Sequence, residues 1–239
     1  MIIYMINIVE FLINKRINKP ITNNIEYTSH PTTFLELTSC IKKELNNDNY
    51  DLNCIDTSNV TSMNGLFFSI KLPKGVQQQL DISKWDVSNV KEMNNMFWGN
   101  NYFNGNIENW NTSSLTSASH MFAGCNAFNQ DLSNWDISKL INAEFMFSNC
   151  ISFEGNGLSN WNTDSLHYVN SMFYYCEKFN EDITNWNMSN VNAIENMFYN
   201  CKMLNQDFEK WNDDGHIAYA YKAFKGCKSM KKYPTWYKQ

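Results

Sequence analysis

Tryptophan recurs along this chain with an almost constant spacing. Successive separations are 25, 25, 26, 25, 25 and 25 residues. The positions that make this register are Trp85, Trp110, Trp135, Trp161, Trp186, Trp211 and Trp236. A fixed period of roughly 20 to 50 residues is the sequence signature of stacked repeats, in which each unit contacts only its neighbours. The chain is therefore predicted to fold as a stack of similar coils.

Two further ladders run in step with the tryptophans. Phenylalanine recurs at Phe97, Phe122, Phe147, Phe173, Phe198 and Phe224. Three residues later come Cys125, Cys150, Cys176, Cys201 and Cys227, with Asn100 in that position of the earliest full coil. Identical residues in stacked coils fall into columns, so we expect both ladders to be buried in the core. This explains an aromatic content of 15% without a ligand.

Each coil divides into two halves with different hydrophobic periods. In the first half, Phe128, Gln130 and Leu132 share one face of an extended segment. In the second half, apolar residues such as Leu140 and Ala143 recur at helical spacing. The pattern predicts an α/β solenoid, a right-handed leucine-rich-repeat-like superhelix with one parallel strand and one short helical segment per coil. The strands are expected to end near Leu132, Leu158, Ile183 and Phe208.

The predicted solenoid spans residues 51–239, and the residues before it are expected to cover its first coil. Residues 30–50 contain Thr33 and Glu36 at capping-box spacing, followed by apolar residues at helical spacing, so they are predicted to form an N-terminal capping helix. In residues 1–29 an amphipathic helix is favoured over an uncleaved targeting anchor. At the other end, Tyr233 and Pro234 suit a final edge strand.

The string FNQDLSNWDISKL, followed by MFSNC, carries a family resemblance. Together with FNEDITNWNMSNV and MFYNC it resembles the repeat of BspA-like leucine-rich-repeat surface proteins, from about Asp51 to the C-terminus. The resemblance implies an adhesion or interaction role, often at a cell surface, and no catalysis. The chain departs from the pattern at Gly157, which stands where neighbouring coils have aspartate.

Charge and residue placement argue against several classes of function. The net charge is −5 and the basic residues are scattered, so no basic stripe for nucleic acid is present. The four histidines share no column of the repeat, and we expect a non-catalytic protein without a cofactor. The ladder cysteines lie 25 or 26 residues apart with no histidine in register, which argues against zinc and favours buried, reduced thiols.

One acidic column could hold calcium or could cap turns. It consists of Asp81, Asp131, Asp182 and Asp207. Neighbouring carboxylates could bridge calcium, but Asn106 and Gly157 interrupt the column and no glycine-rich ligand loop accompanies it. The favoured interpretation is that each aspartate accepts backbone N–H bonds at a turn. We therefore expect no metal site.

The outward positions of the predicted strands are the candidate partner-binding surface. They are Glu108, Gln130, Ser133, Glu181, Thr184, Gln206 and Glu209. Regular alternation would turn Glu181 and Gln206 toward the core, but burying an unpaired charge is costly, so a bend is expected to expose them. The partner would be an unidentified protein or glycan. The alternative is a structural or assembly element without a dedicated ligand site.

The cellular location and assembly state are also expectations at this stage. Asn7, Glu10 and Asn14 interrupt the apolar first residues, so no membrane span is predicted. The absence of a clear signal peptide favours a cytoplasmic location, whereas the family resemblance implies that a cell-surface location is possible. The protein is expected to be a monomer.

Overall fold

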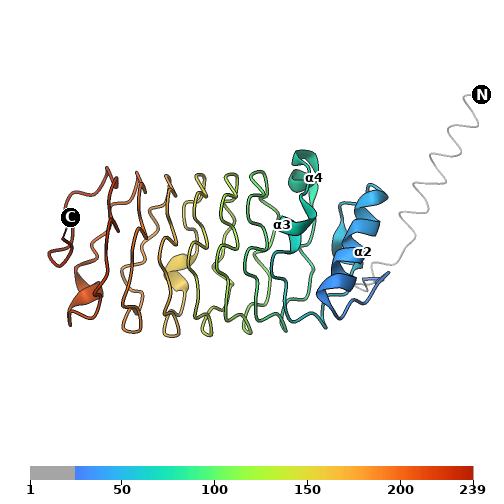
Figure 1. Ribbon diagram of the computed structural model, residues 1–239, viewed down its shortest axis with the longest axis horizontal. Helices are drawn as coiled ribbons and strands as arrows, with labels where there is room; N and C mark the ends of the chain where they lie inside the picture. Colours follow the sequence, from blue (N-terminus) through green and yellow to red (C-terminus); the bar gives the residue numbers. More distant parts are fainter. Residues whose placement is uncertain (1–24, 239) are drawn as a thin grey trace, which may run out of the picture.

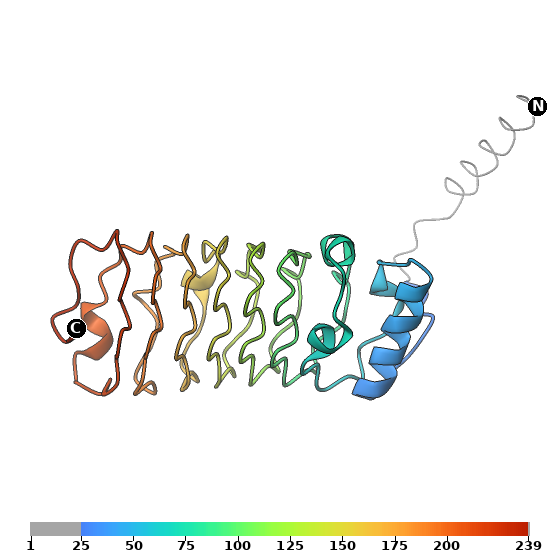
Figure 2. The same cartoon turned by 45° about the horizontal axis from the view of Figure 1, so that its top comes forward.

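The computed structural model describes residues 25–238. The amphipathic helix expected in the first residues of the chain lies outside this range. The coils stack along one long axis, and helix α2 (Phe34–Asn46) lies across the N-terminal end of the stack (Figure 1). The same arrangement is visible after a 45° rotation (Figure 2).

Helix α2 begins at the capping box read from the sequence. The Glu36 N–H donates to Oγ1 of Thr33, and the Thr33 N–H donates to Oε2 of Glu36, both at 3.2 Å. These two bonds satisfy N–H groups that the first turn of a helix leaves without partners. Leu37 and Ile41 form the buried face of α2, which packs against α3 (Leu66–Ile70). The helix thereby covers the apolar end of the first coil.

The expected α/β solenoid, with a strand and a helical segment in every coil, is wrong. Among residues 25–238 the only further helices are α4 (Lys74–Gln79) and the 3₁₀ turns η1 (Leu52–Cys54), η2 (Leu158–Asn160) and η3 (Glu209–Asn212). Neighbouring coils meet at isolated parallel bridges instead of strands. The longest series of bridges runs Ser62, Glu92, Ser117, Asn142, Tyr168 and lies in the half predicted to be helical.

The positions expected to end strands have other roles. Leu158 begins η2 and Phe208 immediately precedes η3. Leu132 and Ile183 are buried in loop segments, and the C-terminal residues Tyr233 and Pro234 form no edge strand.

Backbone hydrogen bonding shows what replaces the strands. Around Phe97, every second N–H donates to a carbonyl of the next coil at 2.8–2.9 Å, namely those of Met93, Asn95, Phe97 and Gly99. The intervening N–H groups of Met96 and Trp98 donate to the carbonyl three residues earlier in their own coil, both at 3.2 Å. The segment therefore satisfies its backbone through tight turns and inter-coil bonds in alternation, which meets the requirement that buried backbone groups be paired.

Left-handed backbone conformations interrupt the coils at regular positions. They occur two residues before each column phenylalanine, at Asn95, His120, Phe145, Ser171, Asn196 and Lys222, with φ between 54° and 58°. A second set follows two residues after the phenylalanine and includes Gly99, Asn149 and Tyr175. An L-residue in this region ends a helix or a strand. Because each coil contains two such residues, no regular element can extend along it.

The predicted buried columns are confirmed. Consecutive rings of the phenylalanine column are nearly parallel; Phe147 lies 5.7 Å from both Phe122 and Phe173 between centroids. In the tryptophan column the indole N–H donates to a carbonyl of the preceding coil, as from Trp135 to Ile107 at 3.0 Å. These contacts join each coil to its neighbours, so stacking and hydrogen bonding use the same columns.

Trp211 is an exception within the tryptophan column. The Trp186 N–H donates to the Leu158 carbonyl at 2.9 Å, but the buried Nε1 of Trp211 has no hydrogen-bond partner among the described residues. Trp211 belongs to η3, and its ring is tilted by 60° against Phe208. The junction between the Trp186 coil and the Trp211 coil therefore lacks the indole hydrogen bond that comparable junctions have.

The cysteine column is buried and carries no disulfide. Each thiol donates to the phenylalanine carbonyl of the preceding coil, as from Cys150 to Phe122 at 3.0 Å. Burial raises the pKa of the Cys227 thiol to about 12, and it also raises the pKa of Cys150. A thiol whose pKa is raised stays protonated at neutral pH, and the protonated form is a poor nucleophile.

We therefore expect the five ladder thiols to react with a maleimide only when the stack opens. Their labelling should be slower than that of an exposed thiol by roughly a thousandfold or more. The half-buried Cys40 and Cys54 lie outside the ladder and serve as internal controls that react earlier. Mass spectrometry of peptides after timed labelling gives the order, and equal rates at Cys40 and Cys150 would contradict a closed core.

Candidate interaction surfaces

The seven residues predicted from the sequence lie at the molecular surface. Ser133 is exposed, and the other six are half-buried. We call the side of the coils that bears Glu108, Gln130, Ser133, Glu181, Thr184, Gln206 and Glu209 the polar edge. Glu181 and Gln206 are not turned into the core, although the strand whose bend was expected to expose them does not exist.

Side chains of the polar edge hydrogen-bond between coils. The Gln130 amide donates to the Asn104 carbonyl at 3.0 Å, and Gln206 repeats this bond to Asn180 at 2.9 Å. Glu181 accepts a bond from the Ser159 hydroxyl at 2.7 Å. Donors and acceptors that a partner could use are thus partly occupied within the protein.

The acidic column caps turns, as the favoured interpretation expected. Asp182 accepts the backbone N–H of Thr184 at 3.0 Å and its hydroxyl at 2.7 Å, and the hydroxyl bond followed by the backbone bond lowers the pKa of this carboxyl. The backbone N–H of Ser133 donates to Asp131 and that of Glu209 donates to Asp207 in the same way. Across residues 25–238, no group of three His, Cys, Asp or Glu side chains could hold a metal ion.

A shallow depression interrupts the polar edge. It has a volume of about 550 Å³, and Glu154, Lys178 and Glu181 are among the residues that line it. One lysine and two glutamates leave it with mixed charge. The depression therefore has no strong preference for either sign of ligand.

The coils also expose large apolar side chains. Apart from Tyr27 and Leu35, one of them is Phe68, which follows the buried Phe67. The others lie within six residues of a phenylalanine-column position: Trp98, Tyr102, Ile141, Ile151, Tyr168, Met203, Tyr219 and Tyr221. Phe68 and Trp98 stack at 4.9 Å with 45% and 44% of their surfaces exposed. His120 continues the row 5.8 Å from Trp98 and stacks on Phe145 at 4.5 Å. We call this row (Phe68, Trp98, His120 and Phe145) the aromatic edge.

A tyrosine cluster lies at corresponding positions of later coils. Tyr174 stacks on Tyr199 at 5.1 Å, and Tyr175 lies 4.7 Å from Tyr174. The ammonium of Lys222 lies 4.6 Å above the ring of Tyr221. Burial, together with the neighbouring phenols, raises the pKa of Tyr174, so this hydroxyl remains protonated and can donate hydrogen bonds at neutral pH.

The sequence reasoning missed both aromatic groups. The predicted partner surface consisted of the polar positions before each tryptophan. One signal was available: Trp98 is the only tryptophan outside the 25-residue register. A tryptophan that the core register does not require is a candidate for a surface role.

A search of known families returned a match over most of the chain. A family model described as "Mycoplasma protein of unknown function, DUF285" matches residues 35–156 and, again, residues 135–236. The double match agrees with the internal repetition. No curated protein and no solved structure matches the chain. Within residues 25–238, no helix has the length and apolar character needed to cross a membrane.

Proposed function

The chain belongs to the DUF285 family of Mycoplasma proteins of unknown function, and on that premise we propose that it is a non-catalytic interaction module that binds another macromolecule through its aromatic edge. The observation that carries the proposal is the pair of stacked, half-exposed rings of Phe68 and Trp98. Water-exposed apolar surface of this kind is unfavourable, and contiguous apolar patches mark sites of association.

The chemistry of the aromatic edge suits protein or glycan recognition. Trp and Tyr are enriched among residues that contribute most to binding, because each presents a large rigid surface with a polar group. The rings are held by stacking between adjacent coils, so little side-chain freedom would be lost on binding. By contrast, Gln130 and Gln206 on the polar edge already bond within the protein.

An adhesion role at the cell surface is the more specific form of this proposal. It rests on the resemblance of the repeats to BspA-like surface proteins, and it requires the chain to reach the outside of the cell. Protease treatment of intact cells tests that requirement. Cleavage of the chain together with survival of a cytoplasmic marker supports adhesion, while full protection favours an intracellular interaction partner.

Site-specific photo-crosslinking tests the choice of surface. A benzophenone amino acid is introduced at Trp98, on the aromatic edge, or at Gln130, on the polar edge, as the matched control. Both side chains reach the surface, so both variants are expected to fold. After irradiation of cells that carry each variant, we expect a discrete adduct from position 98 and none from position 130.

The other outcomes distinguish the competing hypotheses. An adduct from position 130 alone would favour the polar edge, where charge reversal at Glu181 and alanine at Gln206 should then weaken binding without changing the melting temperature. The absence of a discrete adduct from both positions would contradict the interaction proposal and favour a structural or assembly element.

A further inference from the structure

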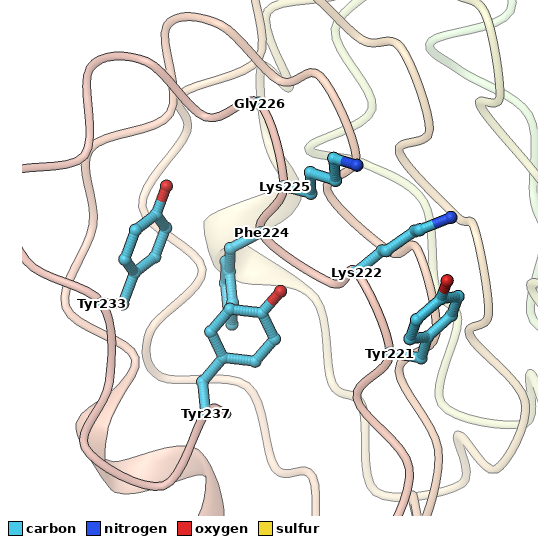
Figure 3. A pocket seen from close by; sticks show the side chains of 7 residues that line it. All are labelled: Tyr221, Lys222, Phe224, Lys225, Gly226, Tyr233 and Tyr237. Atoms are coloured by element: carbon cyan, nitrogen blue, oxygen red, sulfur yellow. The ribbon is translucent and has the colours of Figure 1, made fainter. Parts of the chain in front are cut away.

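A pocket opens beside the last coils of the stack. It has a volume of about 330 Å³ and is lined by aromatic rings and two lysines (Figure 3). The principal lining residues are Tyr221, Lys222, Phe224, Lys225, Tyr233 and Tyr237. Its volume falls within the range of roughly 300–1,000 Å³ that is usual for small-ligand sites. The pocket is large enough for one ring of a ligand.

The apolar part of the pocket is well ordered by ring contacts. Tyr237 meets Phe224 edge to face, with centroids 5.1 Å apart and planes at 82°. Tyr233 lies 6.4 Å from Phe224 on another side. Phe224 itself is fully buried and belongs to the phenylalanine column, so the pocket floor is part of the core. Such a floor would hold its shape in the absence of ligand.

The polar groups of the pocket can donate hydrogen bonds to an anion. Lys222 and Lys225 supply ammonium groups, and Tyr221, Tyr233 and Tyr237 supply hydroxyls. In Figure 3 the Tyr237 ring lies against Phe224, and the Lys222 side chain extends beside Tyr221. Burial raises the pKa of Tyr233 and of Tyr237, so these phenols keep their protons at neutral pH.

The surrounding chain is strongly basic, although the protein as a whole is acidic. From residue 215 to the last residue there are six lysines and no aspartate or glutamate, in a chain of net charge −5. Among the described residues only one of these lysines forms a salt bridge, Lys232 with Glu209 at 3.8 Å. Scattered surface lysines are ordinary solvated side chains, but that does not account for an aromatic cavity lined by two of them.

We propose that this pocket binds an acidic sugar unit, one hexose ring that bears a carboxylate, at the end of a glycan. The carboxylate would pair with Lys222 and Lys225, the apolar C–H face of the ring would lie against Phe224 and Tyr237, and the sugar hydroxyls would bond to the phenols. A purely apolar ligand would offer no hydrogen-bond acceptor to the ammonium groups and phenols that line the pocket. A neutral sugar would offer no opposite charge to the two ammonium groups.

Titration calorimetry on the full chain tests this ligand class. The probes are methyl glucuronide, the neutral methyl glucoside, and adenosine monophosphate as an anion of a different class. We expect the glucuronide to bind about tenfold or more tightly than the glucoside, because the glucoside lacks the carboxylate that would pair with the two lysines. Raising the salt concentration should weaken binding of the glucuronide.

Three variants locate the binding. Lys222→Gln removes one ammonium and should weaken glucuronide binding by about tenfold. Tyr237→Phe keeps the ring and should lower affinity less. Lys139→Gln removes an exposed lysine elsewhere on the stack and should leave affinity unchanged. Circular dichroism melts establish that each variant is folded, and Tyr237→Phe preserves the pocket if Lys222→Gln does not fold.

Several results would overturn the proposal. They are equal binding of the two sugars, preference for the nucleotide, no binding by any probe, or an unchanged affinity in Lys222→Gln. Concentration-dependent self-association lost in Lys222→Gln would instead assign the pocket to a second copy of the chain. Failure of this proposal can be distinguished from failure of the proposed function, because sugar binding to the pocket does not require the aromatic edge that the crosslinking at Trp98 tests.

Discussion

Replacing Phe147 by alanine should lower the free energy of unfolding by about 3–5 kcal/mol. Phe147 is fully buried and stacks between Phe122 and Phe173. It also lies 4.4 Å from Phe153 within its own coil. Truncation would therefore leave a cavity that borders three coils, and neighbouring coils could close it only by breaking their hydrogen-bonded register. Denaturant melts followed by circular dichroism give the change.

The matched variant lies at the end of the same column. Phe224 is also buried, but it has a column neighbour on one side only, Phe198 at 5.5 Å. On its other side are Tyr233 and Tyr237, which belong to the final turn and can move into the vacated space. Phe224→Ala should therefore cost less than Phe147→Ala. Equal losses of stability would contradict a column that is supported from both sides.

Replacing Gly157 by alanine should destabilise the protein by about 2–5 kcal/mol, the sum of overpacking and left-handed strain. Gly157 has φ of 88°, and a Cβ there would lie 2.2 Å from the Ser133 backbone nitrogen of the preceding coil. Backbone cannot move aside as a flexible side chain can. This coil has the single 26-residue spacing, and the close approach explains why glycine replaces the aspartate of neighbouring coils.

Gly75→Ala is the control for the effect of adding a methyl group. Gly75 lies in helix α4, and a Cβ there would meet no atom within 4 Å. Alanine in a helix should leave stability unchanged or raise it by up to about 1 kcal/mol. Thermal melts of the two variants side by side measure the difference. A Gly157→Ala protein as stable as Gly75→Ala would show that the coils can separate at little cost.

The stacking and its columns could be read from the sequence because identical residues repeat at a fixed distance. The path of the chain within a coil could not be predicted from the sequence. Periodicities around Leu132 and Leu140 resembled those of a strand and a helix, yet turns also bring every second or third side chain inward. The chain path depends on residues in the left-handed region. They include Phe145 and Ser171, and phenylalanine and serine are not residue types from which a positive φ can be predicted.

The candidate surfaces could be predicted from the sequence only where residue type, such as charged or lysine-rich positions, indicates exposure. Glu181 and Gln206 were expected at the surface and lie there half-buried, but their hydrogen bonds to other coils depend on a register that the sequence does not give. The exposure of Trp98 depends on one position of offset from the buried Phe97. The lysine-rich residues were visible in the sequence, whereas the cavity that Lys222 and Lys225 help to line follows from how the last turn folds back.

The unpaired indole of Trp211 affects the order in which the coils unfold. A buried donor without a partner costs about 1–3 kcal/mol, and in a stack that cost weakens one junction without changing the others. Fraying from the C-terminus should therefore spread as far as this junction and slow beyond it. The coil that carries the pocket then behaves as a terminal segment that can detach as one unit. A ligand that bridges Lys222 and Tyr237 would lie wholly on the C-terminal side of this junction, so it would hold that segment together without joining it to the rest of the stack.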